Sequence, residues 1–302
     1  MHGWIILDKP LGLGSTQGVS AVKRALRDGG YGPKKKDMPK VGHGGTLDPL
    51  ATGVLPVAIG EATKLAGRML DSDKVYDFTI CFGVETDTLD AEGKEIARSD
   101  TYVDHADVED VLVDFIGPIQ QVPPAYSALK VDGERAYDLA RAGETVALKK
   151  RDVTIHDLRF QNWWNEDGLQ YATLTAHVSK GTYIRSLARD IARAVGSVGH
   201  VTYLRRTKAG PFGLEHAISL DKLADAAKER RLEELLLPLR AGLDDIPALL
   251  LTPGQAGLLR SGQQVTGTIA DDGLVFAMLD DVPVALAEVQ SGIVRVVRGF
   301  NL

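Results

Sequence analysis

The sequence has 302 residues, of which 44% are hydrophobic, and it carries a net charge of −6. That length suits one large domain, or a large and a small one, with ample apolar material for a core. Cys81 is the only cysteine, which excludes an intramolecular disulfide and a cysteine-rich zinc site. The apolar run from Trp4 to Leu7 is too short for a secretory signal, and no later run reaches membrane-spanning length. We therefore expect a soluble protein in a reducing, cytoplasmic setting.

Charge is distributed unevenly along the chain. Residues 71–114 hold 14 acidic and 3 basic side chains, whereas residues 180–208 hold 7 basic side chains and one acidic one, Asp190. Residues 23–40 hold 7 basic and 2 acidic side chains. The negative total argues mildly against a nucleic-acid binder, but the segregation allows a basic face for a polyanion and an acidic back. Each run taken singly is equally compatible with solvated surface charge.

The first expected elements are a strand and a helix. Residues Trp4–Leu7 are predicted to form a strand that enters the loop Asp8–Gly12, and Ser15 or Thr16 is expected to cap the helix that follows. Three apolar side chains form the inward face of this helix: Val19, Val22 and Leu26. The next segment, 29–40, reads GGYGPKKKDMPK. Its glycines, prolines and lysines predict a mobile loop, which is a candidate phosphate contact if RNA is the partner.

The stretch Val41–Gly60 reads VGHGGTLDPLATGVLPVAIG and centres on one carboxylate, Asp48. The glycines before it allow the backbone to approach a ligand closely, and Pro49 biases Asp48 away from helix. The apolar run after it is predicted to be a buried strand that holds the loop still. A carboxylate on such a base can be a nucleophile or an acid–base group. The alternatives are a structural Asp-Pro turn and a phosphate loop, although the Walker spacing and lysine are missing.

A helix at 61–70 and a strand at 74–83 are expected next. Four aromatic or apolar side chains alternate along one face of that strand: Tyr76, Phe78, Ile80 and Phe82. Residues 86–93, TDTLDAEG, are predicted to be a hairpin turn, because they lack the terminal Glu of a calcium loop. Asp104 is expected to start a helix that carries His105 at the surface.

The second half of the large domain is predicted to be extended through 117–133, with a short helix from Glu134. Strands at 153–160 and 169–178 then lead into a helix at 184–195, and residues 203–212 are predicted to be a basic turn. Three basic residues recur every four positions on that helix and so share one face: Arg185, Arg189 and Arg193.

The last part of the chain is predicted to be helical at first and then mostly β. Residues 219–240 are predicted to be helical, 243–247 to be a linker, and 252–262 to hold a short helix. Three short strands are expected to follow: 276–279, 283–289 and 293–300. Together they form a compact, mostly β module of about the smallest size that folds alone. We therefore divide the chain into domains at 1–246 and 247–302.

Five separated stretches together resemble one family. They read LDKPLGLGS, GHGGTLDPLATG, the Tyr76 strand with TDTLDAEG, PPAYSALKVDGERAYDLAR and SKGTYIRSLARDI. In this order they resemble the bacterial tRNA pseudouridine-55 synthases, the TruB family, across essentially the whole chain. The resemblance implies an α+β pseudouridine synthase fold with a mixed, largely antiparallel central sheet. It also implies that the C-terminal module is a small, β-rich, RNA-binding domain of the PUA type.

The activity implied by the resemblance is isomerisation of a uridine in the T-arm loop of tRNA. The implied enzyme uses no metal and no cofactor, and its partner is the T-arm stem-loop. No membrane or protein partner is implied, and a monomer is the simplest expectation.

The resemblance also implies roles for single residues in catalysis. Asp48 matches the catalytic aspartate of the family, and Arg185 matches the arginine paired with it. Tyr76 matches the tyrosine that packs against the target uracil and takes part in proton transfer from the ring. Because burial alone disfavours an ionised carboxylate, a guanidinium at bidentate distance is what would keep it charged.

Further matches concern binding of the RNA. His43 matches the histidine that fills the gap left by the flipped base, and Tyr183 matches a tyrosine of the pocket. Lys9 and Pro10 match the first family motif, near the active site, in a supporting role. Four basic residues are expected to contact the RNA: Lys64, Lys130, Arg189 and Arg193. Extruding a base costs a few kcal/mol, and aromatic stacking, at roughly 1–3 kcal/mol per base, offsets much of that cost.

Two departures from the family pattern and three rival functions remain. Residues 29–40 look longer and more basic than expected, and the acidic total charge predicts RNA binding that weakens steeply with salt. One rival is a tRNA-folding protein for which chemistry is secondary. A second is a glycine-loop phosphohydrolase, which would need a nucleotide or a metal. The third is a guide-RNA-dependent synthase, against which the absence of long basic tails argues only weakly.

Overall fold

The computed structural model describes the chain except for residues 33–36, 128–129, 132–133 and 136–147 and the side chains of 130–131 and 134–135. Its main feature is a nine-stranded sheet. The spatial order is β1 (Gly3–Lys9), β3 (Ala51–Ile59), β12 (Gly199–Ala209), β4 (Lys74–Phe82), β11 (Leu169–Val178), β10 (Arg151–Glu166) and β7 (Gly117–Gln121). Two short strands complete the sheet: β2 (Val41–His43) pairs with β3, and β13 (Phe212–Gly213) pairs with β12. Within this sheet the pairing is antiparallel except between β3 and β12, which confirms the predicted mixed, largely antiparallel α+β architecture.

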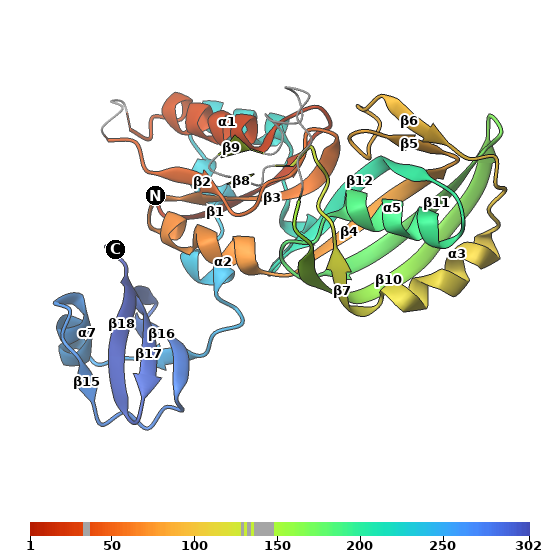
Figure 1. Cartoon of the computed structure of the whole chain (residues 1–302). Coiled ribbons are helices and arrows are strands. Elements are labelled where there is room, and N and C mark those ends of the chain that lie inside the picture. The colour runs from red at the N-terminus through yellow and green to blue at the C-terminus, as the bar shows by residue number, and fades with distance from the viewer. Residues whose placement is uncertain (33–36, 128–129, 132–133, 136–147) are drawn as a thin grey trace.

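Helices cover the two halves of the sheet separately (Figure 1). On one half, α1 (Ser15–Asp28) and α6 (Leu220–Lys228) pack against β1 and β3 in one apolar cluster. On the other half, α3 (His105–Leu112) and α5 (Ile184–Ala194) pack against β4, β10 and β11 in a second cluster. The small hairpin of β5 (Val84–Thr86) and β6 (Glu95–Arg98) lies above α5 in the view of Figure 1. The parallel β3–β12 pair joins the two halves, so loops from both meet beside it.

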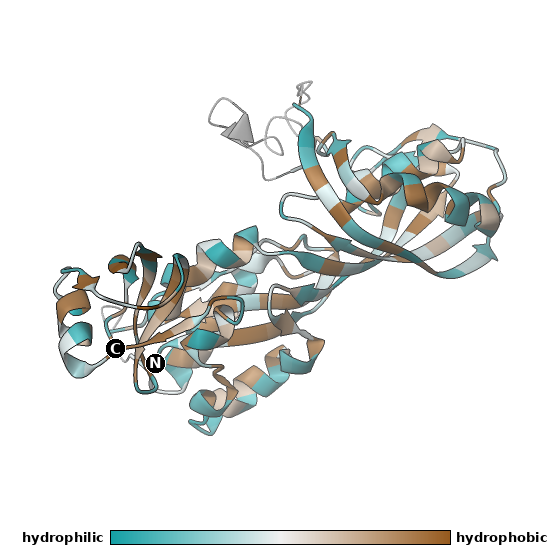
Figure 2. Cartoon of the chain, turned by 90° about the horizontal axis from the view of Figure 1, so that it is seen from below, coloured by the Kyte–Doolittle hydropathy of each residue, from teal (hydrophilic) through white to brown (hydrophobic). Residues whose placement is uncertain are grey.

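The apolar patterns seen in the sequence decide which faces are buried. Phe78, Ile80 and Phe82 of β4 lie in the core with Tyr76 packed against them, as predicted. Figure 2 shows the same alternation of hydrophobic and hydrophilic residues along the long strands. The predicted inward face of α1 is also confirmed: Val19, Val22 and Leu26 are buried.

The predicted cap of α1 is wrong. The N-cap is Gly14, and Ser15 is the first residue of the helix. The Ser15 hydroxyl instead donates to the carbonyl of Leu47 at 2.9 Å and accepts the N–H of Leu47 at 2.8 Å. Ser15 therefore ties the helix to the loop that carries Asp48. Asp104 does cap α3, and His105 is exposed, as expected.

Two predicted helices are shorter than expected. The segment 219–240 is helical only in α6, followed by 3-10 turns η4 (Leu232–Leu235) and η5 (Leu239–Gly242). Arg230 has a φ of 56°, which ends the helix, and the backbones of Leu237 and Trp4 then exchange hydrogen bonds of 2.8 and 2.9 Å. The segment 61–70 is a 3-10 helix, η1 (Gly60–Leu65), followed by α2 (Ala66–Asp71).

Further short elements connect the sheets. Two more 3-10 turns are η2 (Val113–Phe115) and η3 (Leu214–His216). A small ladder of β8 (Lys130–Val131) and β9 (Glu134–Arg135) stands where a helix from Glu134 was expected. The rest of that expected helix, and the lysines 34–36 of the basic loop, lie outside the described residues. No helix in the described part of the chain is long and apolar enough to cross a membrane.

The C-terminal module is a separate five-stranded sheet with one helix, α7 (Pro253–Arg260). Its spatial order is β14 (Ala248–Leu250), β16 (Gly273–Leu279), β17 (Val282–Gln290), β18 (Ile293–Gly299) and β15 (Val265–Thr266). The predicted helix and three of these strands are confirmed, whereas β14 and β15 were too short to predict. Phe276 and Phe300 share an apolar cluster with Trp4 and Met69, so the module is packed against the large domain. The division at 246 and 247 stays our interpretation.

Candidate active site

A cavity of ≈ 340 Å³ opens where the two halves of the large sheet meet. Six separated parts of the chain line it: the loop before β3, Leu70 of α2, the start of β4, Ser127 after β7, the segment from the end of β11 to the start of α5, and the middle of β12. Four residues that the sequence marked are brought together here: Asp48, Tyr76, Tyr183 and Arg185. Lys74, Leu204 and Arg206 also line the cavity, although no role was predicted for any of them.

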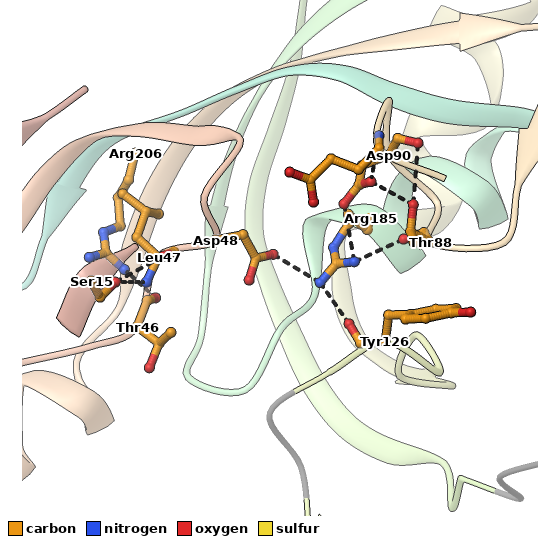
Figure 3. Close-up of polar contacts among 10 residues, drawn as sticks. Ser15, Thr46, Leu47, Asp48, Thr88, Asp90, Tyr126, Arg185 and Arg206 are labelled. Atoms are coloured by element: carbon orange, nitrogen blue, oxygen red, sulfur yellow. Dashed lines mark hydrogen bonds and ion pairs between the residues drawn. The ribbon is translucent and has the colours of Figure 1, made fainter. Parts of the chain in front are cut away.

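Arg185 is the centre of the polar contacts in the cavity (Figure 3). Its Nη2 atom lies 2.9 Å from Oδ2 of Asp48, and its Nη1 atom lies 3.2 Å from Oδ2 of Asp90. The side chains of Arg185 and Asp90 are 8% and 11% exposed, whereas that of Asp48 is 43% exposed. The expected pairing of Asp48 with Arg185 is therefore present, but through one nitrogen and not as a bidentate pair. The second arm of the guanidinium belongs to Asp90.

Backbone carbonyls hold the same guanidinium in place. Nη1 donates to the carbonyl of Thr88 at 2.8 Å, and Nη2 donates to the carbonyl of Tyr126 at 3.0 Å. The Thr88 hydroxyl donates to Oδ1 of Asp90 at 2.6 Å, and the N–H of Glu92 donates to the same atom at 3.1 Å. The predicted hairpin turn at 86–93 thus supplies both a carbonyl and a carboxylate to Arg185. Sequence reasoning missed Asp90 because acidic residues in a turn are usually solvated.

Lys9 fixes the backbone of the loop that carries Asp48. Its buried Nζ donates to the carbonyls of Pro10 at 3.0 Å, Leu13 at 2.6 Å and Pro49 at 3.2 Å. Burial lowers the pKa of Lys9 to about 8, and the nearby Asp48 carboxylate opposes that shift. Lys9 thus contacts the loop that carries Asp48, and Pro10 is one of its acceptors, while the supporting role of both residues stays a prediction.

Arg206 holds the same loop from the other side. It is 1% exposed, and its guanidinium donates to the carbonyls of Val54 at 2.8 Å, Thr46 at 3.2 Å and Gly45 at 3.3 Å. Gly53 pairs with Arg206 across the parallel strands with a φ of +98°, and a Cβ there would lie 2.2 Å from the Arg206 carbonyl oxygen. The expected basic turn at 203–212 is instead mostly strand β12, and this arginine points into the core.

Two tyrosines and a lysine complete the wall of the cavity. Burial raises the pKa of Tyr183, whose backbone N–H donates to Oε1 of Gln121 at 2.8 Å. Tyr76 is half-buried on β4. Lys74, two residues before it, donates to the carbonyls of Met69 and Leu70, each at 2.8 Å, and to that of Ser72 at 2.5 Å. Burial lowers the pKa of Lys74 to about 8.

His43 and Lys64, which are expected to bind RNA, are not among the residues that line the cavity. His43 is on β2, where its Nδ1 accepts the N–H of Gly45 at 3.4 Å, and burial lowers its pKa. Lys64 donates to Glu61 at 2.6 Å and to the carbonyl of Gly299 at 2.9 Å, which ties η1 to the C-terminal module. Lys130 lies on β8, and its side chain is outside the described part of the chain.

The arginines of α5 have partners within the chain. Arg189 is 11% exposed and donates to Asp190 at 2.8 Å and to the carbonyl of Val122 at 3.2 Å. Arg193 is 55% exposed and pairs with Glu85 at 2.9 Å. RNA contact by these two residues stays a prediction. To contact a phosphate, Arg189 would have to leave Asp190 and the carbonyl of Val122, and Arg193 would have to leave Glu85.

The model of the TruB family pseudouridylate synthase N-terminal domain matches residues 34–184, and that of the tRNA pseudouridylate synthase B C-terminal domain matches residues 185–244. The chain belongs to the TruB family. A curated relative from Novosphingobium aromaticivorans, named tRNA pseudouridine synthase B, is 64% identical over 100% of this chain and 98% of its own length. Another of that name, from Zymomonas mobilis, is 60% identical over 100% and 96%.

Solved structures agree with the fold. A Cbf5–Nop10–Gar1 complex contains a chain that matches 99% of this one and 85% of its own length, with a TM-score of 0.73 and 26% identity. An H/ACA RNP bound to a substrate RNA containing 2′-deoxyuridine gives a TM-score of 0.72 at 25% identity, over 99% and 85%. The predicted family and pseudouridine synthase fold are confirmed, and this TruB chain is an isomerase that makes pseudouridine.

Proposed function

We propose that this TruB enzyme isomerises uridine-55 in the T-arm loop of tRNA, with Asp48 as the catalytic carboxylate. Support for tRNA as the substrate comes from the relatives named tRNA pseudouridine synthase B, which are similar over the whole chain. The observation that carries the role of Asp48 is its place at the cavity wall, 2.9 Å from the Arg185 guanidinium.

The reaction sets clear demands on the site. The bond between N1 of uracil and C1′ of ribose breaks, the base rotates, and a C5–C1′ bond forms. The proton on C5 then leaves and N1 takes up a proton, so that the product is an isomer of uridine. A carboxylate can serve by attacking the sugar, by attacking the uracil ring, or by deprotonating the sugar. Asp48 is accessible enough to reach a bound nucleotide, while Arg185 fixes the direction of its carboxylate. That combination of access and orientation suits a reacting group.

The two tyrosines suit the handling of a flipped base. We propose that Tyr76 packs against the target uracil and takes part in removing the C5 proton, and that Tyr183 forms another part of the pocket. Both line the cavity that holds Asp48. His43 would fill the gap in the RNA loop, and Lys9 and Pro10 would keep the Asp48 loop in place through the carbonyl of Pro49.

The remaining parts of the proposal concern the rest of the RNA. Residues 1–246 would form the catalytic domain and 247–302 a PUA-like domain that binds RNA. Four basic residues are proposed to contact the RNA: Lys64, Lys130, Arg189 and Arg193. We further propose a cytoplasmic monomer that needs neither metal nor cofactor for this reaction.

A guide-RNA-dependent activity is the rival that a specific observation favours, since two of the matched structures are H/ACA and Cbf5 assemblies. Their identities of 25% and 26% are far below the 64% and 60% of the relatives named for tRNA. We therefore propose action on tRNA without a guide.

The test is single-turnover conversion of uridine to pseudouridine in an unmodified T-arm stem-loop, with no metal and no guide RNA added. The wild type and Asp48→Asn are compared, and RNA binding is measured for both. We expect product from the wild type only, with binding by both proteins, because the amide keeps the shape of the side chain and loses its nucleophilicity.

Other outcomes would change the proposal in defined ways. Tight binding without product from the wild type would favour a tRNA-folding protein or a requirement for a guide, and addition of guide RNA separates these two. Product from Asp48→Asn at the wild-type rate would show that another carboxylate reacts. Pseudouridine formed at a different position would support the isomerase activity and would exclude uridine-55 as the target.

A further inference from the structure

Three side chains of the types that bind metals lie together outside the cavity. Asp73, His156 and His177 each offer one ligand atom, and these atoms lie within 4.8 Å of one another. Oδ2 of Asp73 is 3.2 Å from Nε2 of His156 and 3.9 Å from Nε2 of His177. The three side chains are between 36% and 48% exposed, so an ion can reach them from solvent.

The large sheet brings these residues together from distant parts of the chain. Asp73 directly precedes β4, and His177 of β11 pairs with Val75 of β4. On its other side His177 faces Asp157 of β10. The register shifts between Ile155 and Asp157, so His156 is the extra residue of a bulge. The two imidazole rings consequently lie with their centres 4.8 Å apart.

The surroundings of the cluster favour a cation. Asp73 and His177 line a hollow of ≈ 510 Å³, which also contains the carboxylates of Asp71, Asp244 and Asp245. Only two cations, Arg68 and Lys208, line the same hollow among the described residues. Arg68 is bound to Asp245 at 3.0 Å and Lys180 to Asp71 at 3.1 Å, so two of the four carboxylates of the hollow are paired with cations. The excess of carboxylates raises the local concentration of cations.

We propose that Asp73, His156 and His177 bind a divalent transition-metal ion of the zinc type. Imidazole nitrogens together with a carboxylate oxygen are ligands that such ions prefer over Mg²⁺ or Ca²⁺. Tetrahedral zinc requires ligand atoms about 3.3 Å apart, given its bond lengths. The 3.2 Å contact of His156 meets that requirement. The 3.9 Å separation of His177 from Asp73, and the ligand-atom separations that reach up to 4.8 Å, would have to shorten when the ion binds. Water would occupy the fourth position.

The ion would join three strands at one end of the sheet. Asp73 is followed directly by Lys74, and Tyr76 lies two positions further on, so the ion would hold the start of the strand that lines the cavity. This binding is independent of the proposed pseudouridylation, because none of the three ligands lines that cavity. The expected effect is on the stability of the fold: an ion that binds only the folded chain raises the unfolding temperature.

The experiment is calorimetric titration of Zn²⁺ into tag-free, chelator-treated full-length protein, with Mg²⁺ titrated in parallel. We expect one Zn²⁺ site and no Mg²⁺ binding at the same concentrations. His156→Gln, His177→Gln and Asp73→Asn should each weaken Zn²⁺ binding at least about tenfold, since even outer-shell partners of metal ligands cost 10–100-fold. The rise in unfolding temperature with Zn²⁺ should disappear in the same variants.

His105→Gln is the matched control. His105 is also exposed, and its Nδ1 lies 2.6 Å from Oδ1 of Asp104. Among the described residues, however, His105 belongs to no group of three potential metal ligands. Its loss should leave the titration unchanged. Absence of Zn²⁺ binding by the wild type would overturn the proposal, and so would equal weakening by His105→Gln. If a variant unfolds, the test uses Cu²⁺ added to the wild type. The electron paramagnetic resonance spectrum of the bound Cu²⁺ should show coupling to two imidazole nitrogens. A spectrum with one coupled imidazole nitrogen, or with none, would reject the site.

Discussion

Arg185 connects Asp48 to Asp90. One guanidinium nitrogen is 2.9 Å from the carboxylate of Asp48, and the other is 3.2 Å from that of Asp90. Asp48 comes from the loop before β3, whereas Asp90 comes from the turn between β5 and β6. Because Asp90 is itself held by the Thr88 hydroxyl and the Glu92 N–H, the position of the Arg185 side chain depends on that distant turn.

Asp90→Asn should slow the chemical step without weakening RNA binding. The amide removes the charge that holds Nη1, so the guanidinium is free to shift and Asp48 loses its fixed direction. A displacement of this kind can cost on the order of a hundredfold in rate. The measurement is the single-turnover rate at saturating enzyme, beside the affinity for the same stem-loop. Asp100→Asn, an exposed acid of the same region, serves as control, and equal rates for the two variants would contradict the role of Asp90.

Arg185→Lys should be more damaging than Asp90→Asn. The guanidinium contacts two carboxylates and the carbonyls of Thr88 and Tyr126 at once. An ammonium is a compact charge without the planar fork, and so it cannot serve all four acceptors in these directions. We expect a larger loss of single-turnover rate with RNA affinity retained. Thermal unfolding of the free variant checks that the fold persists, and a rate close to that of the wild type would show that charge alone suffices.

The cavity residues to which we assign roles could be predicted from the sequence because they stand in local motifs. Asp48 is marked by its glycines and proline, and Arg185 and Tyr183 are marked by the SKGTYIR segment. The groups that position them could not be predicted, because their contacts depend on strand register. Arg206 looked like surface charge in a basic run, yet the parallel pairing of β12 with β3 places it opposite Gly53 in the interior.

Local rules also failed where a tertiary contact offered a better partner. Ser15 has the residue type of a helix cap, but its hydroxyl is used by the backbone of Leu47. The four-residue spacing of the α5 arginines correctly implied a shared helix face. It did not reveal that Arg185 points into the cavity and Arg189 to a carbonyl, because those partners come from loops distant in sequence.

Arg206→Met should destabilise the fold strongly, whereas Arg205→Met should not. Arg206 is buried, and its loss leaves three carbonyls without that donor. Leaving buried polar groups unpaired costs about 1–3 kcal/mol each, so a loss near the lower limit for all three is about 3 kcal/mol. Arg205 pairs with Asp8 in a partly exposed position, where an ion pair contributes about 1 kcal/mol or less. Urea unfolding of both variants measures the difference, and similar midpoints would refute it.

Lys74 should make the stability depend on pH above neutrality. Burial lowers its pKa from 10.5 to about 8 in the folded chain, while an unfolded chain keeps the ordinary value. Below pH 8 both states hold the proton, so stability is independent of this group. Between pH 8 and 10.5 the folded state has released a proton that the unfolded state still binds, and stability therefore rises with pH.

The comparison that isolates this effect is the free energy of unfolding of the wild type and Lys74→Met between pH 7 and 10, since other titrating groups act on both proteins. The wild type should gain stability relative to the variant as the pH passes 8. Lys228→Met removes an exposed lysine and should run parallel to the wild type over the same range. Parallel curves for the wild type and Lys74→Met would mean that Lys74 keeps its proton in the folded chain, with its three carbonyl contacts stabilising the charge more than burial opposes it.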